Sequence, residues 1–177
     1  MCIRDRGSTN SGTNRGTVNV VYTSEQVNGS GLGNTVLSTT NTITVTGSVY
    51  NYASNSVGAA TLSLGNIHAG GSFGSATLSV SNSATGSNGY VETLAGAFAN
   101  SNNLTATNAF SGLTNNGVST NLLFALGSTN SGTNRGTVNV VYTSQTNAGE
   151  TGLANTVFST NTITVTGSVY NYASNSV

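Results

Sequence analysis

Apolar and polar residues alternate along the strongest segments of this chain. Residues 137–142 read T-V-N-V-V-Y, and residues 162–169 read T-I-T-V-T-G-S-V. Alternate side chains of an extended strand project from the same face. The alternation gives each segment one apolar face, made by Val138, Val140 and Tyr142 in the first and by Ile163, Val165 and Val169 in the second. We therefore predict two half-buried β-strands.

Further alternating segments, separated by turn residues, recur through residues 52–171. The expected strands are Thr61–Leu64, Ser75–Val80, Tyr90–Phe98, Asn121–Leu126 and a weaker candidate, Leu104–Phe110. Asn88-Gly89 and Asn116-Gly117 supply the positive φ angles that tight turns need. Seven short strands in about 120 residues, without helical periodicity, predict an all-β antiparallel sandwich. The structural alternative is a parallel β-helix of the autotransporter passenger type, which should show a coil repeat of ~20 residues.

The chain repeats itself at a displacement of 120 positions. Gly7–Ser24 recurs unchanged at Gly127–Ser144, and Thr40–Val57 recurs unchanged at Thr160–Val177. Two blocks with one displacement belong to one repeating unit. The predicted domains are 7–51, the C-terminal part of one sandwich repeat; 52–171, a complete repeat; and 172–177, the start of a further repeat.

The segments that join the identical blocks differ between the copies, and residues 1–6 match neither copy. Glu25–Leu32 and Gln145–Leu153 differ by a small insertion, which one fewer Thr later in the second copy offsets. Surface loops tolerate such insertions at little cost, so we expect hairpin connections here. Residues 1–6, MCIRDR, hold the only Met, Cys and Asp and do not resemble the rest of the chain. We interpret them as a non-native scar and leave them out of fold reasoning.

Composition narrows the function classes. Charged residues make up 5% of the chain, against an average near 25% in soluble proteins, and Lys, Pro and Trp are absent. Low complexity favours disorder, but disordered chains lack the period-two alternation of these segments. After residue 6 the only cations are Arg15 and Arg135, so neither nucleic acid nor an anionic membrane is an expected partner. No apolar run approaches the ~20 residues of a membrane-spanning helix.

Candidate catalytic and metal-binding residues are few. Residues 70–74, G-G-S-F-G, place Ser72 in a G-x-S-x-G pattern, but a nucleophile elbow needs a following helix, an acid and a later His. His68 precedes that Ser and should face solvent, because Ile67 faces the core by alternation. One His without Cys or Asp cannot form a zinc site, and calcium sites need more carboxylates. We expect no enzyme activity, no catalytic or metal site and no cofactor.

The junction between copies reads V-Y-N-Y-A-S-N-S-V in both places. Val169 completes an apolar face, whereas Tyr170 and Tyr172 have the opposite parity. With Tyr50 and Tyr52 of the earlier copy, they are the candidates for packing between repeats, because a Tyr ring can cover a neighbouring sandwich while its hydroxyl stays in water. The alternative is that all four are exposed linker residues.

A family resemblance begins at Ser63–Ala84, which reads SLGNIHAGGSFGSATLSVSNSA, and continues through LLFALGST, GTVNVVYTS and TNTITVTGSVYNYA. This series resembles bacterial proteins described as choice-of-anchor D domain-containing. More distantly, it is similar to the abnormal-spindle/hydin type of immunoglobulin-like domain. The resemblance implies a tandem array of immunoglobulin-like sandwiches, exported and held at the bacterial surface by a C-terminal anchor or transporter. It brings no catalytic or ligand residues with it.

The expected function is that of a non-catalytic stalk, display or adhesive module of a secreted or cell-surface bacterial protein. Its expected partners are neighbouring repeats of the same chain and an extracellular protein or carbohydrate. An autotransporter β-helix adhesin and a carbohydrate-binding module of a surface hydrolase are the alternatives. Exposed aromatic platforms would favour the carbohydrate-binding module, but seven Tyr and no Trp give this alternative little support. An enzyme would need converging titratable groups.

Overall fold

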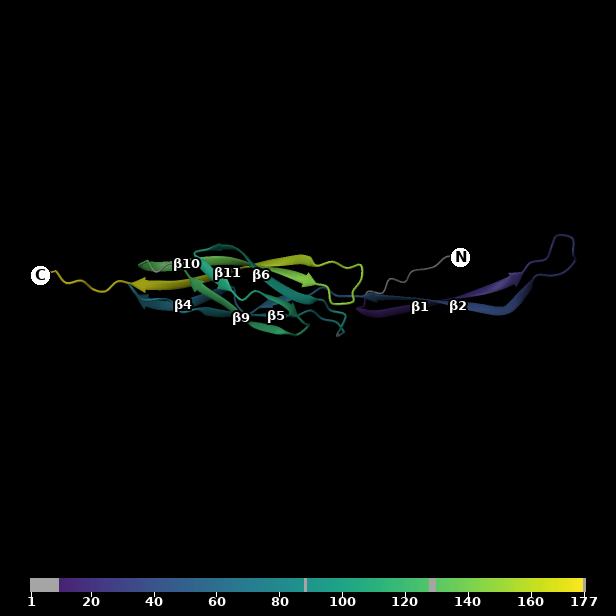
Figure 1. Cartoon of the computed structure of the whole chain (residues 1–177), viewed down its shortest axis with the longest axis horizontal. Helices are drawn as coiled ribbons and strands as arrows, with labels where there is room; N and C mark the ends of the chain where they lie inside the picture. The colour runs from purple at the N-terminus through teal and green to yellow at the C-terminus, as the bar shows by residue number, and fades with distance from the viewer. Residues whose placement is uncertain (1–9, 88, 128–129, 177) are drawn as a thin grey trace. The chain divides into compact units, whose positions relative to one another are not determined.

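The computed structural model describes residues 10–87, 89–127 and 130–176 (Figure 1). The chain divides into two compact units, Met1–Tyr50 and Asn51–Val177, which we call the hairpin unit and the sandwich unit. The predicted scar at residues 1–6 lies outside the described residues.

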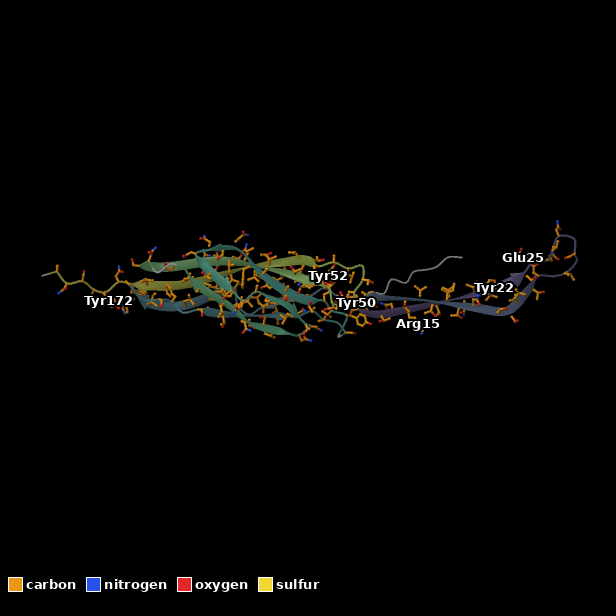
Figure 2. The ribbon with its side chains drawn as sticks, in the orientation of Figure 1. Arg15, Tyr22, Glu25, Tyr50, Tyr52 and Tyr172 are labelled. Carbon is orange, nitrogen blue, oxygen red and sulfur yellow. The ribbon has the colours of Figure 1, made fainter. Side chains whose placement is uncertain are left out.

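The hairpin unit is a two-stranded antiparallel sheet of β1 (Gly12–Ser24) and β2 (Thr35–Val49). Gly12 pairs with Val49 at one end of the ladder, and Ser24 pairs with Thr35 at the other. Residues 25–34 connect the strands, so Glu25–Leu32 lies in a hairpin connection as predicted. Figure 2 shows the side chains of the hairpin unit, including Arg15 and Tyr22, which project from this two-stranded sheet.

The sandwich unit consists of two sheets (Figure 1). One sheet has the strand order β4-β11-β10-β6-β8 and the other has the order β3-β5-β9-β7. The strands are β3 (Asn55–Val57), β4 (Thr61–His68), β5 (Ala76–Asn82), β6 (Thr93–Asn102), β7 (Leu104–Thr107), β8 (Phe110–Leu113), β9 (Val118–Leu126), β10 (Gly132–Gln145) and β11 (Thr156–Tyr170). The β10–β11 hairpin therefore occupies central positions in the larger sheet.

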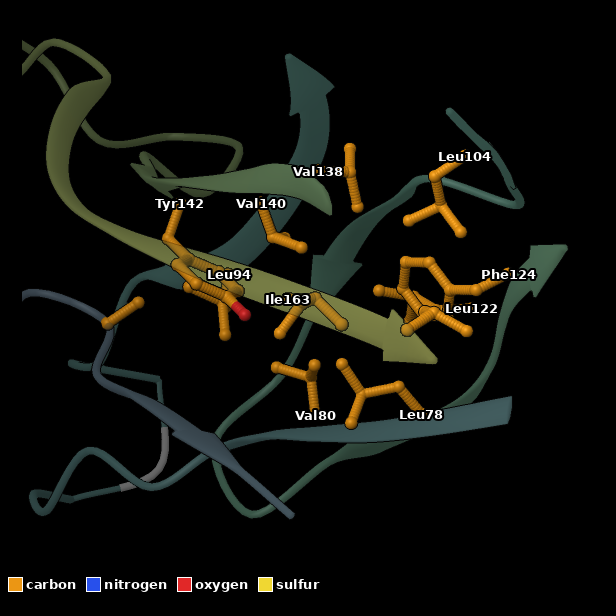
Figure 3. Packing of buried hydrophobic residues seen from close by; sticks show 12 residues of the cluster. Leu78, Val80, Leu94, Leu104, Leu122, Phe124, Val138, Val140, Tyr142 and Ile163 are labelled. Carbon is orange, nitrogen blue, oxygen red and sulfur yellow. The ribbon is translucent and has the colours of Figure 1, made fainter. Parts of the chain in front are cut away.

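Both predicted apolar faces point into the core between the two sheets. Val138, Val140 and Tyr142 of β10 are fully buried, as are Ile163 and Val165 of β11. Figure 3 shows Ile163 pointing toward Val80, a residue of the opposite sheet. Fully burying such a side chain stabilises the fold by roughly 1.5–3 kcal/mol. Period-two alternation thus predicted the core correctly.

The all-β sandwich is confirmed, and the β-helix alternative is wrong, because strands pair mainly antiparallel within two sheets. Three details differ from the prediction. β4 pairs with β11 in parallel. The weak candidate Leu104–Phe110 is not one strand: β7 joins the smaller sheet and β8 begins at Phe110 in the larger one. The three-residue strand β3 was not predicted, because three residues are too few to establish a period.

The copies differ at two places: the second has one more residue between the paired Ser144 and Thr156 than the first has between Ser24 and Thr35, as predicted, and the first has one more residue within a strand. The additional Thr of the first copy lies within β2, and the β1–β2 register shifts between Val21 and Thr23. In the second copy, the corresponding shift follows Tyr142. A β-bulge accommodates an extra residue while the ladder continues on either side. Gln145 likewise belongs to β10 rather than to the predicted connection.

Two glycines of the β10–β11 hairpin allow other segments to approach it closely. A Cβ on Gly136 would lie 2.6 Å from the backbone oxygen of Asn103, and a Cβ on Gly167 would lie 2.4 Å from the Phe73 ring. Real Cβ atoms do not make contacts this short. Glycine is therefore required at position 136 by the backbone packed on it, whereas a side chain at position 167 would require the Phe73 ring to move.

We predict that Gly136→Ala lowers the free energy of unfolding of the sandwich unit by about 1–3 kcal/mol, because the backbone of Asn103 must move. Thermal melting of the full chain, followed by circular dichroism, measures the change. Gly16→Ala is the matched control, since a Cβ added to this residue of β1 would meet no atom within 4 Å. Equal melting temperatures for the two variants would contradict the prediction.

Candidate functional site

Three aromatic side chains gather at the end of the sandwich where β4 and β11 finish. Tyr170, the last residue of β11, is in register with His68, and the Ala69 amide donates to the Tyr170 carbonyl at 2.9 Å. The Tyr172 ring stacks on His68, with a centroid distance of 4.7 Å and an interplanar angle of 13°. His68 is exposed, as predicted, and so are both tyrosines.

The other two candidate tyrosines do not join this cluster. Tyr52 is exposed and precedes Ala53, whose amide donates to Ser144 Oγ near the end of β10. Because Val169 pairs with Gly132 at the start of β10, Tyr52 and Tyr170 lie at opposite ends of the sandwich. Tyr50 belongs to the hairpin unit. Packing of these tyrosines between repeats stays a prediction.

The residues considered for other chemistry are dispersed. Ser72 is exposed in the connection between β4 and β5, and strand β5 follows it. Arg135 is an exposed residue of β10 whose guanidinium donates to Thr164 Oγ1 at 3.5 Å. Within the described ranges, no group of three His, Cys, Asp or Glu side chains could hold a metal ion. No helix in the described part of the chain is long and apolar enough to cross a membrane.

A buried polar cluster closes the sandwich at the Tyr52 end. Ser144 Oγ accepts a hydrogen bond from the Ala53 amide at 2.7 Å and donates to Glu92 Oε2 at 2.5 Å. Asn82 Oδ1 accepts from the Ser54 amide at 3.1 Å, and Asn82 Nδ2 donates to the Glu92 carbonyl at 3.1 Å. Asn82, Glu92 and Ser144 are all buried. The cluster therefore fastens the entering chain to β5, to β10 and to Glu92, the residue before β6.

This cluster is suited to holding structure rather than to catalysis. Glu92 and Ser144 are buried, which leaves no room for a substrate at their hydrogen bond. His68 cannot act as a base for Ser144, because it lies at the opposite end of the sandwich. Sequence reasoning missed the cluster, although one signal was present: Glu92 is one of three Glu in the chain and lies in a segment predicted as a strand.

Tyr142 combines full burial with an unpartnered hydroxyl. Its ring fills the core, and no described residue forms a hydrogen bond with its OH. Desolvation raises the pKa of Tyr142 to about 12, because burial disfavours the charged phenolate. The corresponding residue of the hairpin unit, Tyr22, accepts a hydrogen bond from Asn41 Nδ2 at 3.1 Å. The same residue thus has two environments in one chain.

An open hollow of about 440 Å³ lies beside β5, β8 and β9 and is lined by Thr77, Asn108, Ala109, Phe110, Ser119, Asn121 and Leu123. Its one aromatic residue, Phe110, is half-buried and packs against Gly96. A sugar-binding platform needs an exposed aromatic face, so the hollow does not favour the carbohydrate-binding alternative.

A comparison with protein-family models finds no match, and no curated protein matches the chain.

We predict that Ser144→Ala lowers the free energy of unfolding by about 1–3 kcal/mol, because it leaves the buried Glu92 carboxylate and the Ala53 amide without a partner. Urea unfolding of the full chain measures the loss. Ser24→Ala is the matched control, since Ser24 is the exposed counterpart of Ser144 in β1. A loss no larger than that of the control would show that the cluster contributes nothing to stability.

Tyr142→Phe should leave stability at pH 7 unchanged or raise it by up to about 1 kcal/mol, because it removes a buried hydroxyl without a partner. The folded-state pKa, about 12, lies above the ordinary value of 10.0. The unfolded state therefore releases this proton first, and stability falls as pH rises from about 10 to 12. Tyr142→Phe should weaken this alkaline loss in urea titrations. An unchanged alkaline slope in Tyr142→Phe would refute the assignment.

Proposed function

We propose that the chain is part of a tandem array of immunoglobulin-like β-sandwiches that serves as a non-catalytic stalk, display or adhesive module of a secreted or cell-surface bacterial protein. The proposal includes the resemblance to choice-of-anchor D domain-containing proteins. Neighbouring repeats of the same chain are its first partners, and an extracellular protein or carbohydrate is the ligand class for adhesion.

The observation that carries the proposal is the match between the sequence period and the fold. The first backbone bridge of the sandwich unit joins Asn51 to Val91, and its last strand ends at Tyr170. The period of 120 positions therefore coincides with one complete sandwich. Asn171, the residue after the last strand, begins a second copy of the segment that starts at Asn51. A repeat that equals one fold unit is typical of tandem arrays.

Connection length supports a stalk. β2 ends at Val49 and the sandwich unit begins its bridges at Asn51, so Tyr50 is the only residue between them. Flexible linkers reach further as they lengthen, and one residue allows little independent motion. Tyr170 is the equivalent of Tyr50 in the second copy, and it directly follows Val169, the last core-facing residue of β11. Short junctions of this kind suit extension and display.

The side chains that could take part in catalysis are dispersed over the sandwich unit, which supports a non-catalytic role. Glu92 is enclosed, His68 stacks on Tyr172 at the other end, and Ser72 is isolated in a loop. An active site would need a nucleophile, a base and stabilising donors within reach of one substrate. The few charges also suit a surface that contacts partners through hydroxyl and amide groups rather than through ion pairs.

We predict that replacing Tyr50, Tyr52, Tyr170 and Tyr172 with Ser broadens the distance distribution of the full chain in small-angle X-ray scattering, because ring packing at the junctions limits motion. Tyr22→Ser is the control, since Tyr22 lies within β1, away from the junctions. Scattering curves that superimpose for the wild type and the fourfold variant would contradict a stiffening role for these tyrosines.

A further inference from the structure

We infer that the β1–β2 hairpin is a docking element that completes the segment 52–126 of a second copy of this chain, by strand complementation, when the β10–β11 hairpin of that copy is displaced. The partner segment spans β3 to β9, the strands that cover the β10–β11 hairpin in the sandwich unit. This inference stands on contacts and exposure and does not depend on the role of the array as a stalk.

The two hairpins share one sequence pattern and one register. Gly12 pairs with Val49 and Val21 with Thr40 in the first hairpin, while Gly132 pairs with Val169 and Val141 with Thr160 in the second. Every pair between these limits recurs at the same displacement. The first hairpin therefore presents its side chains in the arrangement that segment 52–126 already accommodates.

The docking face of the first hairpin is exposed at Tyr22, Ile43 and Val45 and half-buried at Val18 and Val20, whereas its copy is fully buried. Tyr22 is 44% exposed, Ile43 49% and Val45 62%, whereas Tyr142, Ile163 and Val165 are each 0% exposed. Contiguous apolar patches on a protein surface commonly mark interaction sites. Because the two hairpins have the same residues at these positions, the difference between their exposed fractions shows which side chains segment 52–126 covers.

The glycines of the first hairpin fit one particular partner. A Cβ added to Gly16 or to Gly47 would meet no atom within 4 Å. Their copies, Gly136 and Gly167, are each held against residues of segment 52–126, namely Asn103 and Phe73. Nothing in the hairpin unit itself requires glycine at 16 or 47, whereas docking of a second segment 52–126 requires it at 16 and would bring the Phe73 ring against 47.

Both outer edges of the first hairpin also fit this segment. β6 pairs with the outer edge of β10 in antiparallel fashion, and β4 pairs with the outer edge of β11 in parallel. The sheet of β1 and β2 contains these two strands alone among the described residues. Its edges therefore offer backbone donors and acceptors to strands like β6 and β4.

The chain cannot satisfy this hairpin with its own segment 52–126. In the sandwich unit, Asn55 Nδ2 donates to Asn161 Oδ1 at 2.9 Å, and nine residues of β11 separate Asn161 from Tyr170, about 30 Å at ~3.3 Å per residue. If the first hairpin replaced the second, Tyr50 would stand at the Tyr170 position. The five residues from Tyr50 to Asn55 reach at most about 18 Å. A segment 52–126 that covers the first hairpin must therefore belong to another copy of the chain.

The two kinds of hairpin compete for segment 52–126, and this competition determines when docking occurs. Each chain has two hairpins of one pattern but a single segment 52–126. The second hairpin follows that segment after a short connection, so its effective concentration is far higher than that of a hairpin on another chain. The wild-type chain thus keeps its own hairpin in place. Disabling the second hairpin opens the segment to the first hairpin of a neighbouring chain, which produces head-to-tail multimers.

The test uses the full chain with Cys2→Ser, so that introduced cysteines are the only ones. Val140→Asp with Val165→Asp disables the second hairpin, and V21C with A97C reports docking, because Val141 pairs with Ala97 in the sandwich unit. We expect concentration-dependent multimers in light scattering and a ladder of disulfide-linked dimers and longer species on non-reducing gels. V21C alone should form no such ladder.

Matched variants identify the interface. Val20→Asp with Val45→Asp, the same changes in the first hairpin, should leave a folded monomer without cross-links. All four Asp changes together should abolish both the ladder and the cooperative melt. A milder pair, Val140→Ala with Val165→Ala, covers the case in which Asp prevents folding, and it should form the same ladder at a lower yield.

Two results would overturn the inference. One is an unfolded monomer without cross-links in both the Asp and the Ala pair, which would mean that the first hairpin cannot complete the segment. The other is cross-linking of V21C alone at the same yield, which would mean that hairpins associate with each other instead.

Discussion

A β-hairpin with one apolar face gains stability from strands that extend its edges and from a second sheet that covers that face. In the sandwich unit, β6 and β4 extend the β10–β11 hairpin, and β5 and β9 lie in the sheet that faces it. An isolated two-stranded hairpin is marginally stable in water. This coverage determines where the remaining strands lie. It also brings other segments against Gly136 and Gly167 and buries Tyr142.

Buried hydrogen bonds also fix where the chain enters the sandwich unit. Asn82, Glu92 and Ser144 hold the entering residues Ala53 and Ser54 against the sandwich through buried hydrogen bonds. Such bonds fix the start of the sandwich unit at the end opposite to Tyr170, where its last strand finishes. A chain that enters at one end and leaves at the other suits serial repetition, which is the basis of the proposed array.

Sequence reasoning succeeded where the signal is local and periodic. The alternation at Val138–Tyr142 depends on neighbours two positions away, so it predicted strands and core face together. It failed where the cause is non-local. The separation of β7 from β8 into different sheets, the parallel β4 and the buried Glu92 are determined by contacts with distant segments. No pattern could show that Tyr22 and Tyr142, which lie in identical sequences, differ in burial.

Hydrogen exchange of the full chain, followed by NMR, tests the central claim most directly, because identical sequences have identical intrinsic exchange rates. The account predicts that amides of Val138–Val141 exchange only through global opening of the sandwich, whereas those of Val18–Val21 exchange orders of magnitude faster. Equal protection of the two segments would contradict it, since the hairpin would then be stable without the strands that cover its copy.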